Sequence, residues 1–204
     1  KSISTSVAKK EGTEAVTLRY AGPIAYSRSG ATYAGRFNAE NNTNIGYAAN
    51  FSNSTGNYNV SVGYQSLNSN TASQNTAVGY QAGYSNTTGV DVAYMGYQAG
   101  YGNTGDRNVA VGRGVLFASG AGSYNAGVGY AALNSNTSGN NNTALGSNAL
   151  YSNTTASYNT AVGYQAGYSN TTGYENTFLG YIAGYSNTTG NDNVFVGRLA
   201  GNSN

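Results

Sequence analysis

The sequence predicts an all-β fold, a parallel β-solenoid of about ten coils of 16–17 residues each. Two observations lead to this prediction: one glycine-centred motif recurs ten times at nearly constant spacing, and the residues around each glycine alternate with a period of two. Only 8% of the 204 residues are charged, which is also typical of disordered chains. A disordered chain, however, lacks apolar residues in a fixed register, so we expect a folded rod.

Each repeat is centred on a glycine, and most of its other positions also keep their character. An aliphatic residue or Met precedes the glycine, Asn stands four positions before it in most copies, and Tyr follows it in seven of ten copies. A turn rich in Ser, Asn, Thr and Gly closes each copy. The repeat glycines are Gly46, Gly63, Gly79, Gly96, Gly112, Gly129, Gly146, Gly163, Gly180 and Gly197.

A unit of this length holds two short strands and two turns, and it buries an apolar face only by stacking on its neighbours. We therefore predict that the aliphatic column, of which Val162 is a member, packs in the core. The Asn column, with Asn159 as an example, is expected to form a ladder of side-chain amides that satisfies the backbone of the turns. Ten coils at a strand spacing of about 4.8 Å give a rod roughly 45–50 Å long.

Two aromatic rows run along the predicted rod. The Tyr that follows each glycine shares a strand face with the aliphatic residue, so we expect this row to be half-buried and stacked on itself. A second row, which begins at Phe51, lies beside the turn and is expected to be the more exposed one. Exposed aromatic rings bind sugars or a neighbouring subunit, and the candidate binding residues are Tyr84, Tyr101, Phe117, Tyr151, Tyr168 and Tyr185.

Uniform copies favour a shaft rather than a tip. The least regular copies lie around residues 91–95 and 117–123, and a binding site on the rod is expected there.

Residues 1–43 do not follow the repeat and are interpreted as a cap or linker before the solenoid domain at 44–204. Strands are predicted over 2–8 and 13–21, a turn at Gly22-Pro23, and no clear period is visible over 27–42. The chain stops within a repeat, which suggests that the natural protein continues. Six of the nine Lys and Arg residues lie in the first 43 positions. The solenoid therefore lacks the basic stripe of a nucleic-acid binder, and no apolar run is long enough for membrane insertion.

The sequence predicts no enzyme, no cofactor and no metal site. The absence of His and Cys removes an imidazole base and the usual zinc ligands. Glycoside hydrolysis needs two carboxylates about 5–10 Å apart, whereas the acids of the repeat region are spread mostly over separate coils, at Asp91, Asp106, Glu175 and Asp192.

The turns also contain Asn-x-Ser/Thr triplets, at Asn86, Asn153, Asn170 and Asn187. In a eukaryotic secretory setting these would be glycosylation acceptors. The interpretation that we favour is that Asn and Thr are good turn residues, which the repeat copies.

The repeats at 75–83 (Asn-Thr-Ala-Val-Gly-Tyr-Gln-Ala-Gly) and 176–184 (Asn-Thr-Phe-Leu-Gly-Tyr-Ile-Ala-Gly) resemble the head repeats of trimeric autotransporter adhesins. The longer turn, with Ser-Asn-Thr-Thr-Gly at 85–89, is similar to repeats of phage tail-fibre proteins. The resemblance implies a left-handed β-roll and a homotrimer, intertwined or side by side. It also implies attachment to a cell-surface glycan or protein receptor.

The expected function is therefore a structural extracellular fibre segment, either a phage tail-fibre shaft on the virion or an adhesin on a bacterial cell surface. Two alternatives stay open. One is a self-assembling extracellular filament that stacks through its open sheet edges. The other is an ice-binding solenoid, which needs a flat row of Thr; Thr143, Thr160 and Thr177 form part of such a row, but Ala93, Val109, Ala126 and Val194 interrupt it.

Overall fold

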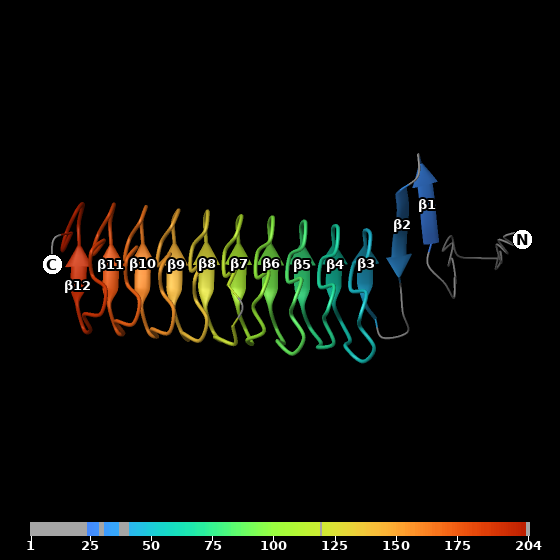
Figure 1. Cartoon of the computed structure of the whole chain (residues 1–204), viewed down its shortest axis with the longest axis horizontal. Helices are drawn as coiled ribbons and strands as arrows, with labels where there is room; N and C mark the ends of the chain where they lie inside the picture. Colours follow the sequence, from blue (N-terminus) through green and yellow to red (C-terminus); the bar gives the residue numbers. More distant parts are fainter. Residues whose placement is uncertain (1–23, 29–30, 37–40, 119, 203–204) are drawn as a thin grey trace, which may run out of the picture.

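The computed structural model describes residues 24–28, 31–36, 41–118 and 120–202. Within them, twelve strands form one sheet in the order of the sequence (Figure 1). The strands predicted over 2–8 and 13–21 and the turn at Gly22-Pro23 lie outside the described residues.

The first two strands form an antiparallel hairpin, β1 (Ile24–Arg28) with β2 (Ala31–Arg36). Strand β2 then pairs antiparallel with the first strand of the solenoid, where Gly35 lies opposite Ile45. The absence of a clear period over 27–42 thus concealed a strand, because the sequence of β2, Ala-Thr-Tyr-Ala-Gly-Arg, does not alternate apolar and polar residues.

The predicted parallel β-solenoid is confirmed. Ten strands of three residues each stack in parallel and in register, so that Thr160 lies beside Thr177 and Val162 beside Leu179 (Figure 1). These strands are β3 (Thr43–Ile45), β4 (Val60–Val62), β5 (Thr76–Val78), β6 (Ala93–Met95), β7 (Val109–Val111), β8 (Ala126–Val128), β9 (Thr143–Leu145), β10 (Thr160–Val162), β11 (Thr177–Leu179) and β12 (Val194–Val196).

Each coil contains one strand, and the second strand predicted per coil is wrong. The return leg alternates residues with positive φ, such as Gln81 at 51° and Gly83 at 61°, so its backbone cannot be extended. Its main chain is nevertheless bonded to the next coil: the N–H of Gly83 donates to the carbonyl of Ala99 at 2.9 Å. The coils are therefore held together on both legs, although only one leg is a regular sheet.

The core lies between the strand and the return leg, and it is filled by pairs of matched size. The middle residue of each strand faces inward, and the return leg supplies the residue four positions after the repeat glycine. Where the strand supplies Ala144, the return leg supplies Leu150, and both are buried. Where the strand supplies the ring of Phe178, the return leg has Gly184, at which a Cβ would lie 2.1 Å from that ring.

The aliphatic column does not pack in the core, contrary to the prediction. Leu145 is 49% exposed and Met95 52%, and Val162 is only partly buried. Period-two alternation allows one inward residue per three-residue strand. The inward residue is the middle one, which is Ala in several coils and an aromatic ring at Tyr94 and Phe178, so the aliphatic residue beside it points outward. The more hydrophobic face of the strand is therefore the outer one.

The repeat glycine is required where the chain leaves the strand. Gly163 has a φ of +138°, and a Cβ there would lie 2.3 Å from the carbonyl oxygen of Gly180 in the next coil. Both the conformation and the close approach of the neighbouring backbone exclude a side chain.

The predicted Asn ladder is confirmed. The Nδ2 of Asn142 donates to the carbonyl of Ala156 at 2.8 Å, and its Oδ1 accepts from the N–H of Asn159 at 3.0 Å. Each buried Asn thus ties its own coil to the next one. In the fourth coil, that of β6, Val92 replaces this Asn, and its N–H still donates to Oδ1 of Asn75 at 3.1 Å.

A second Asn ladder runs through the turns, formed by residues whose sequence pattern indicates only turn residues or glycosylation acceptors. The Nδ2 of Asn153 donates to Oδ1 of Asn136 at 2.9 Å and to the carbonyl of Ala156 at 3.0 Å. Asn86, Asn153, Asn170 and Asn187 are all buried with their amide nitrogens donating in this way. A glycan on Nδ2 would require the turn to open, so the structure supports the turn interpretation.

Replacing the repeat glycine should destabilise the rod. We expect Gly163→Ala to cost more than about 2 kcal/mol, because the new Cβ meets backbone and the φ is unfavourable. The measurement is thermal or urea unfolding followed by circular dichroism. Gly114→Ala is the matched control: its φ of +65° is also left-handed, but Ala131 adopts such a φ at the same repeat position, and the new Cβ would have only Asn134 Nδ2 within 4 Å, at 3.6 Å. We expect a smaller loss, of about 1–2 kcal/mol. Equal losses in the two variants would contradict the close-approach argument.

Removing one rung of the Asn ladder should also be costly. Asn142→Ala leaves the Asn159 N–H without its partner, while the Ala156 carbonyl keeps the hydrogen bond from Asn153 Nδ2. One buried unpaired group costs about 1–3 kcal/mol, so we expect a loss of about that size in urea unfolding. Ser138→Ala, at an exposed position of the same coil, should leave stability unchanged, and a loss as large as that of Asn142→Ala would sink the ladder argument.

Candidate functional site

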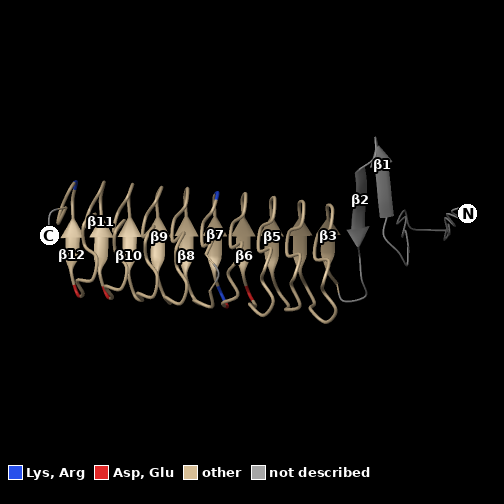
Figure 2. Ribbon diagram, in the orientation of Figure 1, with Lys and Arg blue, Asp and Glu red and all other residues tan. Residues whose placement is uncertain are grey.

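The outward face of the parallel sheet carries two columns of side chains and no charged residue. One column contains Thr, Val and Ala, and the other is the aliphatic column. In Figure 2 the coloured segments of the coils lie in the turns, while the strands are tan. The outward residues are Thr43, Val60, Thr76, Ala93, Val109, Ala126, Thr143, Thr160, Thr177 and Val194 in the first column, and Ile45, Val62, Val78, Met95, Val111, Val128, Leu145, Val162, Leu179 and Val196 in the second.

The tyrosines that follow the repeat glycines form the predicted stack along one border of this face. Tyr64 stacks on Tyr80 with ring centroids 5.3 Å apart, and Tyr80 on Tyr97 at 5.0 Å. The seven tyrosines of this row are 41–52% exposed. The row is therefore half-buried, as predicted, and its stacked runs, Tyr47 to Tyr97 and Tyr164 with Tyr181, present ring edges to solvent.

The second aromatic row also stacks, but apart from its first member, Phe51, which is 64% exposed, it is not the more exposed row. Tyr84 lies on Tyr101 at 5.2 Å, and Tyr168 on Tyr185 at 5.1 Å. The candidate residues Tyr84, Tyr101, Tyr151, Tyr168 and Tyr185 are all partly buried, and only Phe117, at 37%, counts as exposed. The row lies on the irregular return leg rather than beside the flat sheet. The two columns contain the same residue type, so the sequence does not indicate which of them is the more exposed.

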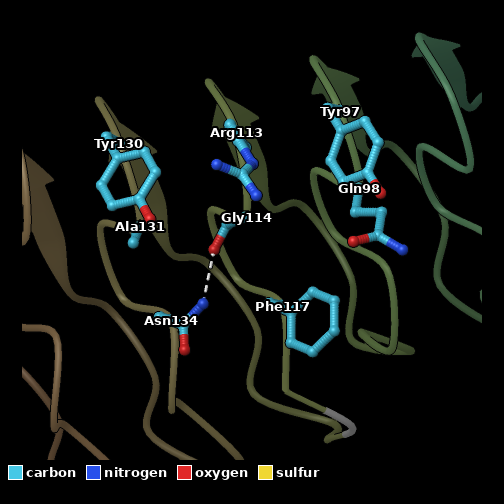
Figure 3. A pocket seen from close by; sticks show the side chains of 8 residues that line it. All are labelled: Tyr97, Gln98, Arg113, Gly114, Phe117, Tyr130, Ala131 and Asn134. Atoms are coloured by element: carbon cyan, nitrogen blue, oxygen red, sulfur yellow. Dashed lines mark hydrogen bonds between the residues drawn. The ribbon is translucent and has the colours of Figure 1, made fainter.

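The first aromatic row is interrupted at the fifth coil, that of β7, where a hollow forms. Arg113 takes the place of Tyr, and its Cζ lies 5.5 Å from the ring centroid of Tyr97 and 5.7 Å from that of Tyr130. The hollow measures about 220 Å³ and is also lined by Gln98, Gly114, Phe117, Ala131 and Asn134 (Figure 3).

The structure thus brings one of the six predicted binding residues, Phe117, into this hollow, and it spreads the other five along the rod. Sequence analysis did not single out Arg113 and Gly114. The signal that could have found them is their departure from the repeat, since both neighbouring coils have Tyr in place of Arg113 and the three preceding coils have Gln in place of Gly114. Residue 117 does lie in one of the two least regular segments, where a site was expected.

The four acidic residues of the described coils, Asp91, Asp106, Glu175 and Asp192, lie outside the strands. Asp91 forms an ion pair with Arg107 at 3.4 Å, and a hydrogen bond to Tyr124 raises the pKa of the Arg107 guanidinium. Within the described ranges, no group of three His, Cys, Asp or Glu side chains could hold a metal ion. The same part of the chain contains no helix long and apolar enough to cross a membrane.

Two tyrosines have perturbed titration. Burial raises the pKa of Tyr94 far above its usual range; its hydroxyl donates to Oδ1 of Asn103 at 2.9 Å inside the core. Burial between its stacked neighbours also raises the pKa of Tyr168. Both groups favour the neutral phenol in the folded rod.

Comparison with protein-family models, with curated proteins and with solved structures finds no match to this chain. The fold class, a parallel β-solenoid, therefore stands on the coordinates alone.

The stability of the rod should fall above pH 10. Unfolded tyrosines ionise near a pKa of about 10, whereas Tyr94 and Tyr168 retain their protons to higher pH in the folded state. The folded state then binds more protons, so stability is complete below pH 10 and declines above it. Thermal melts between pH 8 and 11 provide the measurement. Tyr94→Phe should lessen the decline, and an unchanged melting temperature over this range for the unmodified chain would contradict the argument.

Proposed function

We propose that the chain is a rigid segment of a homotrimeric extracellular fibre, of the phage tail-fibre or bacterial adhesin kind, that serves attachment to a host or cell surface. The observation that carries this proposal is the uncharged outward face of the sheet, which runs the whole length of the solenoid.

This face has the properties of an association surface. Ten strands at about 4.8 Å give a strip about 43 Å long. Side chains such as Met95 and Leu145 are half exposed along it, and the strip contains no Lys, Arg, Asp or Glu. Contiguous apolar patches of this kind on soluble proteins mark interaction sites. An isolated chain would leave them in water.

The occupant that best fits the face is another copy of the same chain. A partner of equal length and equal strand spacing can align its Val and Leu columns with those of the first chain over many coils. Three copies side by side, as in the trimeric adhesins that the repeats resemble, would cover the aliphatic columns around a common axis. The tyrosine row would then lie near the rim, available to a surface.

The chemistry of the rod also suits a passive shaft. The described coils carry few charges, mostly at turns (Figure 2). Two amide ladders and two aromatic stacks run along the axis, and each coil is hydrogen-bonded to the next. These features give length and stiffness rather than a catalytic centre.

The mass of the chain in solution tests the proposal. Light scattering on a sizing column should give three times 20.9 kDa, or 62.7 kDa. Because charges on the outward strip would be buried at the interface, the double variant Leu145→Lys with Val162→Lys should elute as one chain with its circular dichroism unchanged. Thr155→Lys, on an exposed turn, is the matched control and should remain a trimer. A single-chain mass for the unmodified protein would overturn the proposal.

Ice binding is a second candidate, because the Thr row lies on the exposed face of a regular parallel sheet. Thr143 and Thr160 are exposed and pair directly with each other along the rod. Val60, Ala93 and Val109 interrupt the row. Thermal hysteresis of a single-chain form would favour this candidate, and its absence at millimolar protein would remove it.

A further inference from the structure

Three rows of the repeat break at one place on the rod. The tyrosine row is replaced by Arg113, and the Gln row, in which Gln98 donates to Gln81 at 3.0 Å, ends at Gly114. In the next coil the second aromatic row is replaced by Asn134, whose Nδ2 donates to the carbonyl of Gly114 at 2.8 Å. Side chains that fill the surface elsewhere are thus absent here, and the hollow of about 220 Å³ is the result (Figure 3).

The guanidinium of Arg113 is held ready for an anion. Tyr97 and Tyr130 flank it along the rod axis, one in the preceding coil and one in the following coil (Figure 3). Within the described part of the chain, no carboxylate lies within ion-pair distance of it. Arg presents a planar fork of N–H donors that matches a carboxylate in a bidentate geometry. Two rings restrict the side chain, so less conformational freedom is lost when a ligand binds.

The walls of the hollow suit a ring with one apolar face and several hydroxyl groups. Phe117 is 37% exposed, and Tyr97 and Tyr130 are about half exposed, so aromatic surface is available on three sides. Nε2 of Gln98 donates to Oε1 of Gln81 in the preceding coil. In the following coil Gly114 has no side-chain amide that could donate to Oε1 of Gln98. This oxygen lies on the side of the hollow and can accept from a ligand hydroxyl (Figure 3). The volume is below the roughly 300–1,000 Å³ of a drug-sized site, which limits the occupant to about one sugar ring.

We propose that this notch, formed by Tyr97, Gln98, Arg113, Gly114, Phe117 and Tyr130, binds a carboxylated sugar of an acidic surface glycan. The carboxylate pairs with Arg113, the apolar face of the pyranose packs on an aromatic ring, and a hydroxyl donates to Gln98. The inference rests on the proposed attachment function and specifies the ligand class.

A carboxylated sugar fits these groups better than two simpler ligands. A neutral sugar would use the rings but leave the flanked guanidinium without an anion. An inorganic anion would use Arg113 and leave three exposed rings unused. The combination of a cationic side chain and exposed aromatic rings therefore favours a ligand with both a negative charge and an apolar ring face.

The test is calorimetric titration of the full chain with two matched pairs of probes: tri-galacturonate with its methyl ester, and sialyllactose with lactose. We expect at least one carboxylated probe to bind and its neutral counterpart to bind about tenfold more weakly or not at all. Arg113→Gln should weaken binding by about tenfold or more. Gly114→Gln should do the same by filling the notch with the residue that Gln81 and Gln98 provide in their own coils, at a position where positive φ is already tolerated.

The control variant is Arg198→Gln, which removes an Arg at the same repeat position, also beside a tyrosine ring, at 5.7 Å from Tyr181. It lacks the notch, because Leu199 follows it, and it should bind like the unmodified chain. The proposal is overturned if no carboxylated probe binds at millimolar concentration, if neutral probes or sulfate bind equally well, or if Arg113→Gln and Arg198→Gln have the same effect.

The mass of each sample, measured in parallel, separates this inference from the proposed function. A trimer that binds no carboxylated probe retains the fibre and removes the notch. A single chain that binds such a probe through Arg113 retains the notch and removes the trimeric fibre.

Discussion

Every feature of this rod depends on the direct stacking of each coil on an equivalent coil, one strand spacing away. At that distance a residue meets its own counterpart in the repeat, so any side chain at a repeated position must be compatible with a copy of itself. Asn satisfies this condition because its amide has both a donor and an acceptor, and Tyr satisfies it because rings stack. Glycine is needed where the backbones themselves approach, as at Gly163 and Gly180.

The same condition explains how much of the fold could be predicted from the sequence. The period alone predicts the number of coils, the parallel sheet, the Asn ladder and the stacked tyrosines, because these follow from like residues meeting. The period cannot tell which strand face is inside. That choice depends on the residue that the return leg places opposite the strand, such as Leu150 opposite Ala144 and Gly184 opposite Phe178. As a result Ala161 is buried and Val162 faces outward, the reverse of what hydrophobicity suggests.

The candidate site was harder to predict because a hollow is made by side chains that are missing. Arg113, Gly114 and Asn134 belong to two coils, and each is unremarkable by itself. Only the stacked coils show that these three residues, each of which differs from the usual residue at its repeat position, lie next to one another. Phe117 can be predicted because it belongs to an aromatic row that is easily seen in the sequence. The replacements at Arg113, Gly114 and Asn134, which open the hollow beside its ring, are not easily seen.

The size-matched core has a consequence for how such a rod can change its length. Coils with an aromatic ring inside, such as that of Phe178, have glycine in their own return leg and in the preceding one, at Gly184 and Gly167. Coils with an inward Ala and a Leu have no room for such a ring. Gain or loss of coils by unequal recombination is therefore neutral only at junctions that keep these neighbours together. The repeats look interchangeable from outside, but the segment that can be duplicated or deleted without disturbing the core is a group of adjoining coils rather than a single coil.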